Sequence, residues 1–379
     1  MTSVTDILAG RKICICAGSG GVGKTTTAAA IAVGLAARGK KVAVLTIDPA
    51  KRLADSLGLE ELGNEPRKVD ERLFAEAGIE TKGELWAMML DAKATFDELV
   101  ARNAPDERAR DRILENRIYR QISNALAGSQ EYMAMEKLYE LHQEGDYDFL
   151  VLDTPPSRNA LDFLDAPRRL TQFIEGRSLQ IFMKPTGLVT RVVGQGGAVM
   201  FSVLKRVIGF DLLSDIAEFL QSFGDMVDGF RDRAKRVSEL LADAETSFIV
   251  VCGPQGEPIE EAIYFQRKLL EAELPVGGVI VNKVHYELDG SGDVSAAVRE
   301  AGLPDDLADR VAANFEDYRV LARRDEENID RLRRDLEAQE VIRVPYLDED
   351  VHDLSGLLEI DRFLFASGEE RERIVAGLS

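Results

Sequence analysis

Apolar runs bounded by turn-forming residues recur along the chain, and most of them do not alternate with polar positions. The runs are KICICA (residues 12–17), KVAVLTID (41–48), YDFLVLD (147–153), SFIVVC (247–252), GGVIVN (277–282) and VIRVP (341–345). Short runs rich in Val and Ile without alternation are typical of strands that are covered on both faces. Helical patterns separate them, so the sequence predicts an α/β fold with a doubly wound, mostly parallel sheet.

Two intervals between the predicted strands are too long for simple crossovers. Residues of approximately 72–145 and 167–245 are predicted to be helical and to form a subdomain inserted into a single domain that spans residues 1–379. A further long, charged helix is predicted over residues 307–340, where it would lie on the surface.

The segment 186–223 is unusually apolar, but Arg191 leaves too short an uncharged stretch to span a bilayer. The N-terminal residues lack the apolar core of a signal peptide. We therefore expect a cytoplasmic protein without direct membrane insertion.

The chain carries a formal net charge of −20, and its sequence pI is about 4.7. Such a charge repels nucleic acids and anionic lipid surfaces, so neither is an expected partner. The three cysteines, Cys14, Cys16 and Cys252, do not form a disulfide framework or a zinc site with so few histidines. They are predicted to be core residues.

A phosphate-binding loop occupies residues 18–25, GSGGVGKT, after the first predicted strand and before an alanine-rich helix that ends near Gly39. In such loops the backbone amides and the helix N-terminus bind phosphate groups. The predicted nucleotide-binding residues here are Gly18, Ser19, Gly20, Gly21, Val22, Gly23, Lys24, Thr25 and Thr26. Lys24 is expected to reach the β- and γ-phosphates of ATP, with the Thr25 hydroxyl on Mg²⁺.

Two aspartates lie at the ends of predicted strands. Asp153 ends DFLVLD, where an acid can hold the Mg²⁺ shell. Asp48 precedes Pro49 at the end of the second strand, where a carboxylate can orient the attacking water. Taken alone, Asp48 also fits a turn or helix-capping aspartate.

Six motifs make the chain similar to a known family. They are GGVGKTT, TIDPAKRLADSLG, GSQEYMAMEKL, LDTPPSRNALDFLDAP, VIVNKV and VPYLDEDVHDLSGL. In this order they resemble segments of the ArsA/Get family, which comprises arsenite-pump ATPases and the ATPases that target tail-anchored membrane proteins. The resemblance implies a phosphate-loop ATPase of the deviant Walker A group, with ATP and Mg²⁺ as ligands.

The resemblance also implies roles for single positions. Asp48 would activate water in a first switch, and Asp153 would contact the metal shell at the start of a second switch whose residues 154–167 move with nucleotide state. Asn282 would read adenine, and Pro345 would belong to a loop that covers the base. Glu131 falls on a family acid near the dimer interface.

The chain departs from the family pattern at the phosphate-binding loop. Family members usually carry a lysine where this chain has Ser19, and that lysine crosses the dimer interface to the partner's phosphates; serine lacks its charge. A heterodimer with a paralogous ATPase that carries the lysine would restore one such charge. Alternatively, a homodimer uses Lys51 or Arg52, or turns over more slowly. The Arg158–Asn159 pair also replaces a Gly-His pair of the second switch.

Together these features predict an ATPase whose ATP cycle opens and closes a dimer and so controls a client on the helical subdomain. A hydrophobic protein segment is the candidate client, and the apolar helices of residues 186–223 would form either its groove or an internal interface. The alternative is a positioning ATPase similar to MinD or ParA, acting on membrane or DNA. The acidic chain and the mixed charge of its C-terminal segment disfavour that alternative.

Overall fold

The computed structural model describes residues 3–48, 51–79, 81–117, 119–120, 130–154, 226–287, 294–302, 304–336, 341–347 and 350–377. Its chain divides into two compact units. The sheet unit comprises Met1–Met88, Asp146–Ala160 and Asp243–Ser379, and the helical unit comprises Met89–Gly145 and Leu161–Ala242.

The sheet unit is built on eight strands in the order β3-β4-β2-β5-β1-β6-β7-β8. The strands are β1 (Ile13–Ala17), β2 (Lys41–Thr46), β3 (Arg67–Lys68), β4 (Glu84–Met89), β5 (Phe149–Asp153), β6 (Thr246–Cys252), β7 (Val276–Val284) and β8 (Val341–Pro345). From β2 to β8 the neighbouring strands run parallel, whereas β3 and β4 are antiparallel. The mostly parallel α/β sheet is therefore confirmed.

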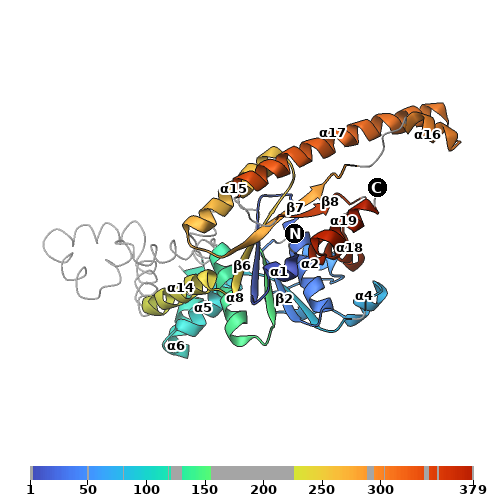
Figure 1. Ribbon diagram of the computed structural model, residues 1–379. Helices are drawn as coiled ribbons and strands as arrows, with labels where there is room; N and C mark the ends of the chain where they lie inside the picture. Colours follow the sequence, from blue (N-terminus) through green and yellow to red (C-terminus); the bar gives the residue numbers. More distant parts are fainter. Residues whose placement is uncertain are drawn as a thin grey trace, which may run out of the picture. The chain divides into compact units, whose positions relative to one another are not determined.

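Helices cover both faces of this sheet (Figure 1). They are α1 (Val4–Ile7), α2 (Lys24–Ala37), α3 (Arg52–Ser56), α4 (Glu71–Glu76), α15 (Gly256–Glu271), α16 (Val294–Glu300), α17 (Asp305–Asp335), α18 (Leu354–Phe365) and α19 (Gly368–Ala376). α2 and α18 pack together on one face, and α15 and α17 lie against β6 and β7 on the other. Every residue of the central strands β1, β5 and β6 is buried, which explains their unbroken apolar sequences.

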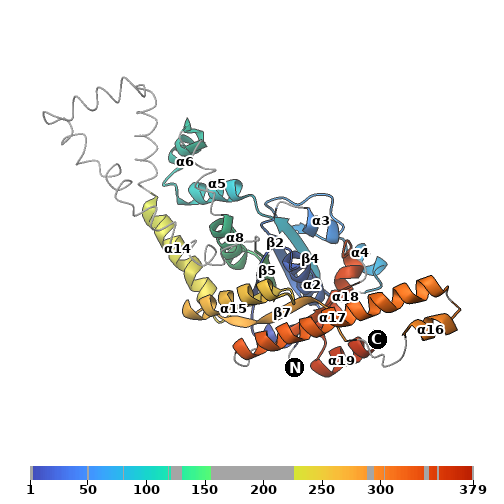
Figure 2. The ribbon, with the colours of Figure 1, turned by 90° about the horizontal axis from the view of Figure 1, so that it is seen from above.

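α17 is long enough to extend past the sheet, where it pairs with α16 (Figure 2). Its buried residues are Ala308 near its start and Ala322, Asp325, Ile329 and Leu332 in its second half. The long charged helix predicted over residues 307–340 is thus present, with bounds of Asp305–Asp335.

All six strands expected from the apolar runs are present, but the expectation that residues 72–145 are helical throughout is wrong. Glu84–Met89 form β4, which joins the sheet beside β2 and pairs with the short β3. β4 was missed because its residues, ELWAMM, neither alternate cleanly nor form a run of β-branched residues.

The helical unit contains α5 (Ala92–Asn103), α6 (Glu107–Glu115), α8 (Gln130–Glu144) and α14 (Val227–Ala242) among its described residues. Phe96 of α5 stacks on Tyr119 and Phe230, with both centroid distances 6.1 Å. An ion pair joins the buried Glu136 of α8 to the half-buried Arg233 of α14. Burial raises the pKa of Glu136, and the nearby Arg233 opposes that shift.

Several expectations fall outside the described residues. The apolar segment 186–223 and the second-switch residues that follow Thr154, including Arg158 and Asn159, are among them. Glu131 lies half-buried in the first turn of α8. Within the described part of the chain, no helix combines the length and the apolar character that crossing a membrane would require.

Candidate nucleotide-binding site

The phosphate-binding loop connects β1 to α2, and its glycines are there for steric reasons. Gly21 and Gly23 have φ values of +78° and +91°, in the left-handed region that side chains disfavour. A Cβ on Gly18 would lie 1.9 Å from the Val251 carbonyl oxygen of β6, and one on Gly23 would lie 2.3 Å from Asn282 Nδ2. The loop therefore needs glycine to pack against β6 and β7 while its backbone turns into α2.

Lys24 is the first residue of α2 and is buried beneath the loop. Its Nζ donates a 2.7 Å hydrogen bond to the Ser19 carbonyl oxygen, across the loop. Burial lowers the pKa of Lys24, while Asp153 and Asp48 act in the opposite direction. The Ser19 hydroxyl is itself buried and has no hydrogen-bond partner among the residues that the structure describes.

Asp153 ends β5 directly beside the loop. In the register of the sheet it lies opposite Cys16 of β1 on one side and Thr46 of β2 on the other. Its Oδ2 accepts hydrogen bonds from Thr25 Oγ1 at 2.7 Å and from Thr46 Oγ1 at 2.9 Å. Burial raises the pKa of Asp153 to about 6, although both hydroxyl bonds and Lys24 oppose the shift.

The residues around Asp153 fit a magnesium ion. Asp153 Oδ1 is buried and has no hydrogen-bond partner within the described part of the chain, and the Thr25 hydroxyl donates to the other oxygen of the same carboxylate. Mg²⁺ prefers such oxygen ligands and is commonly held by one or two protein groups together with substrate phosphates. Among the described residues no cluster of three or more His, Cys, Asp or Glu side chains forms an all-protein metal cage. An ion shared with a nucleotide is the arrangement these residues suit.

Asp48 follows β2 at the same edge of the sheet and is half-buried. Its backbone N–H donates to Thr46 Oγ1 at 3.2 Å, and Thr46 in turn donates to Asp153. The negative charge of Asp48 contributes to the raised pKa of Asp153. The structure therefore brings Lys24, Thr25, Asp48 and Asp153 together at the carboxyl ends of neighbouring strands, where ligands of open α/β sheets bind.

The residues expected to contact the base lie farther along the same edge. Asn282 is buried near the end of β7, and its Nδ2 donates to the Val22 carbonyl oxygen at 3.0 Å. Pro345 is buried at the end of β8, where it pairs with Val284 of β7. Thr26 lies half-buried in the first turn of α2.

Two residues of this site were not expected from the sequence. Thr46 connects Asp48 to Asp153, and its signal was a single polar residue inside the apolar run VAVLTI. Lys283 places its Nζ 3.3 Å from the Gly21 carbonyl oxygen. Its neighbour Asn282 had marked this segment, but nothing in VIVNKV showed that the lysine turns back to the loop.

The cysteines have the structural role that was expected. Cys14, Cys16 and Cys252 are free and buried. Cys14 and Cys16 face the same side of β1, with their sulfur atoms 3.9 Å apart. Burial raises the pKa of Cys252 to about 12, which leaves that thiol protonated.

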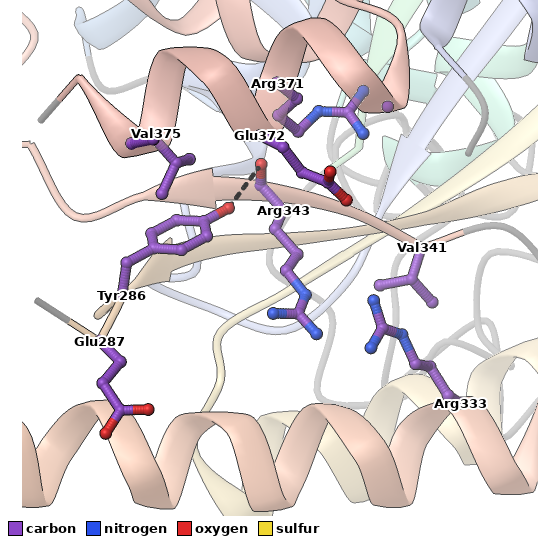
Figure 3. A pocket seen from close by; sticks show the side chains of 10 residues that line it. Tyr286, Glu287, Arg333, Val341, Arg343, Arg371, Glu372 and Val375 are labelled. Carbon is purple, nitrogen blue, oxygen red and sulfur yellow. Dashed lines mark hydrogen bonds between the residues drawn. The ribbon is translucent and has the colours of Figure 1, made fainter. Parts of the chain in front are cut away.

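A cavity of about 370 Å³ lies elsewhere in the sheet unit, between β8, α17 and α19 (Figure 3). None of its lining residues belongs to the phosphate-binding loop. Arg343 in its wall makes two hydrogen bonds to Glu326, and Arg371 donates to the carbonyl oxygens of Phe363 and Ala366. Arg343 thus joins β8 to α17, and Arg371 joins α19 to the end of α18. We assign no ligand to the cavity.

A glycine-rich loop between a buried strand and a helix, a lysine under it and an aspartate on the loop's threonine define a phosphate-loop nucleotide-binding protein. A family profile described as anion-transporting ATPase matches residues 11–324 of the chain. The chain therefore belongs to the anion-transporting ATPase family, known as the ArsA ATPase family, and is an ATPase.

Relatives that are named as ATPases support this family membership. The chain is 25% identical over 306 residues to the ATPase get3 of Aspergillus terreus, a match that covers 80% of this chain and 82% of the relative. It is 26% identical over 319 residues to the ATPase ARSA2 of Chlamydomonas reinhardtii, covering 80% and 76%. It is 23% identical over 278 residues to the ATPase GET3A of Arabidopsis thaliana, covering 71% and 66%.

Proposed function

We propose that this ATPase uses Mg²⁺ and ATP to close a dimer, and that hydrolysis reopens it and changes the affinity for a client held by an inserted helical subdomain. The observation that carries this proposal is the hydrogen-bonded series from Thr25 through Asp153 and Thr46 to the backbone of Asp48. It connects the loop that would hold the phosphates to the segment after β2. A change at the phosphates would therefore have a hydrogen-bonded route to that segment.

The metal ion and the residues of the site each have a proposed task. Bound Mg²⁺ would neutralise charge on the phosphate oxygens during phosphoryl transfer. Lys24 would leave the Ser19 carbonyl oxygen and bind the β- and γ-phosphates, and Thr25 with Asp153 would hold the metal. Asp48 would orient the attacking water and accept its proton. Asn282 and Pro345 would bind the adenine.

Dimer closure requires a modest free energy. Moving a two-state equilibrium from almost entirely open to almost entirely closed takes about 5.5 kcal/mol of differential binding, which two nucleotide sites can share. Ser19 lacks the charge that a lysine would bring to such an interface. The partner is therefore either a second copy of this chain or a paralogous ATPase with a lysine at that position.

The test is the mass of the purified protein in solution, without nucleotide and with ATP and Mg²⁺, in an Asp48→Asn background. This substitution is expected to leave ATP bound while stopping hydrolysis, and Lys24→Ala is expected to abolish nucleotide binding as the matched control. A shift from monomer to dimer supports closure of the chain on itself. A monomer in ATP points to the lysine-bearing partner. Wild-type rates of hydrolysis by Asp48→Asn would contradict the role of Asp48.

The client part of the proposal has its own measurement. A labelled peptide of about twenty apolar residues, the length of a membrane-spanning segment, serves as the probe. Binding that differs between the ATP-bound Asp48→Asn variant and the ADP-bound protein supports a nucleotide-controlled client site. Equal binding, or none, in both states contradicts it.

A further inference from the structure

A β-bulge in β7 lies directly beside the phosphate-binding loop. Val281 pairs with Arg343 and Val284 pairs with Pro345, so two residues of β7, Asn282 and Lys283, face the single Val344 of β8. Bulges of this kind change the direction of side chains and occur often next to functional sites.

The bulge directs two consecutive side chains to two consecutive carbonyl groups of the loop. Asn282 Nδ2 donates to Val22, and Lys283 Nζ lies 3.3 Å from the Gly21 oxygen. The outer turn of the loop, Gly21 and Val22, is thus held by two side chains from the end of β7.

Lys283 reaches the loop through an uncommon backbone conformation. Its φ is +64°, in a region that residues other than glycine rarely adopt. The side chain is exposed, so burial of apolar surface does not explain why a lysine occupies this position. Strained backbone conformations cluster at functional sites, where the surrounding structure maintains them. What this conformation achieves is to bring the ammonium group to Gly21.

We propose that Lys283 is a positioning residue for the nucleotide. Its ammonium group holds the outer turn of the loop at Gly21, and its methylene stem covers one side of the nucleoside. This inference depends on the proposed binding of ATP with its base at Asn282. A nucleoside that runs from the loop toward Asn282 passes the stem, which starts at the adjacent residue and ends at the loop. Lysine stems cover apolar surface in this way while the charged end stays hydrated.

The two parts of the side chain can be separated by substitution. Lys283→Gly removes both parts and tolerates the positive φ, so its fold is not at risk. Lys283→Met keeps an apolar stem and removes the ammonium group. Lys40→Ala is the control, because Lys40 is an exposed lysine just beyond the C-terminal end of α2, whereas the loop precedes that helix. The affinities for ATP and for inorganic tripolyphosphate, both with Mg²⁺, are measured by calorimetry.

Lys283→Gly is expected to weaken ATP binding about tenfold and tripolyphosphate binding about threefold, so that the ratio of the two affinities falls. Lys283→Met is expected to weaken tripolyphosphate binding equally but to retain the wild-type ratio, because the stem is present. The KM for ATP is expected to rise in Lys283→Gly. A role limited to folding would lower the melting temperature of the nucleotide-free protein instead of this ratio.

The outcomes separate this inference from the function on which it depends. If the wild-type protein does not bind ATP, the proposed function fails and the role of Lys283 fails with it. If the wild-type protein and Lys283→Gly bind ATP equally, or if the affinity ratio does not change, the inference alone is overturned. An equal loss in Lys40→Ala would also overturn it, because a general effect of positive charge would then suffice.

Discussion

Asp153 shows how burial and function compete at a single carboxyl group. Two hydroxyl groups donate to one of its oxygens, but the other oxygen is buried and no described residue bonds to it. A chain selected for stability alone would not keep such a group, because a buried charge without full compensation is costly. A metal ion at this oxygen would compensate for the burial. Without metal and nucleotide the buried carboxylate is uncompensated, so the stability of the protein depends on whether Asp153 is ionised and therefore on pH.

The first prediction concerns Asp153→Asn. In the folded chain the pKa of Asp153 is about 6, against 3.8 for an ordinary aspartate. The folded state therefore binds this proton more tightly than the unfolded state, and ionisation destabilises the fold. The cost is fully present above pH 6, falls as pH drops through 6, and is gone below pH 3.8; its size is on the order of 3 kcal/mol.

Asparagine stays neutral throughout, so Asp153→Asn should gain stability relative to wild type as pH rises from 4.5 to 7. Urea unfolding of metal-free and nucleotide-free protein at both pH values measures the difference. Asp146→Asn, at a fully exposed carboxylate, is the control and should show no such trend. A stability difference between Asp153→Asn and wild type that does not change with pH would contradict the raised pKa.

At the scale of the elements, the helix that follows the loop is fixed by its contact with α18. A Cβ on Gly34 of α2 would lie 2.0 Å from Asp361 Oδ1 and 2.4 Å from the Phe365 ring. Arg38, the residue that follows α2, adds a 2.8 Å ion pair with Asp361 at the same contact. The loop precedes α2, so its position depends on the close approach of α2 and α18 at Gly34, near the other end of α2.

The second prediction is that Gly34→Ala destabilises the protein, although alanine normally stabilises a helix interior relative to glycine. Overpacking at such a contact typically costs about 1–3 kcal/mol. Gly256→Ala at the start of α15 is the matched control, because no described atom outside its immediate neighbours lies within 4 Å of the new Cβ. That variant should stay within about 0.5 kcal/mol of wild type in urea unfolding. Equal stability of the two variants would show that α18 moves away freely.

The strands and loops differ in how far the sequence could predict them. The six apolar runs and the loop could be recognised because strands buried on both faces and phosphate-binding loops have local patterns. β4 could not, because ELWAMM becomes a strand through its partner β3 and its place beside β2. The bulge at Asn282 and Lys283 depends on the register between β7 and β8, and no glycine marks the positive φ.

In the proposed dimer two nucleotide sites would meet at the interface, and this chain has Ser19 where a lysine would cross to the partner's phosphates. The Ser19 hydroxyl is buried without a partner among the described side chains and backbone, and Gly20 beside it is exposed. The loop therefore presents backbone and no charge at the point where a crossing cation would start. In a homodimer both crossing charges would be missing, whereas a lysine-bearing partner would supply one of them.

The last prediction follows from the number of lysine charges that cross the dimer interface. Ser19→Lys, in the Asp48→Asn background with ATP and Mg²⁺, should strengthen self-association at least tenfold, because each charge-assisted hydrogen bond contributes about 1.5–3 kcal/mol and a homodimer has two such sites. Sedimentation equilibrium measures the dissociation constant, and Ser19→Gln controls for side-chain length without charge. Without nucleotide the variants should not differ, because the lysine would have no phosphate to reach. If Ser19→Lys leaves the ATP-dependent dimer no tighter than wild type, the missing charge does not limit closure, and Lys51 or Arg52 becomes the cation to replace next.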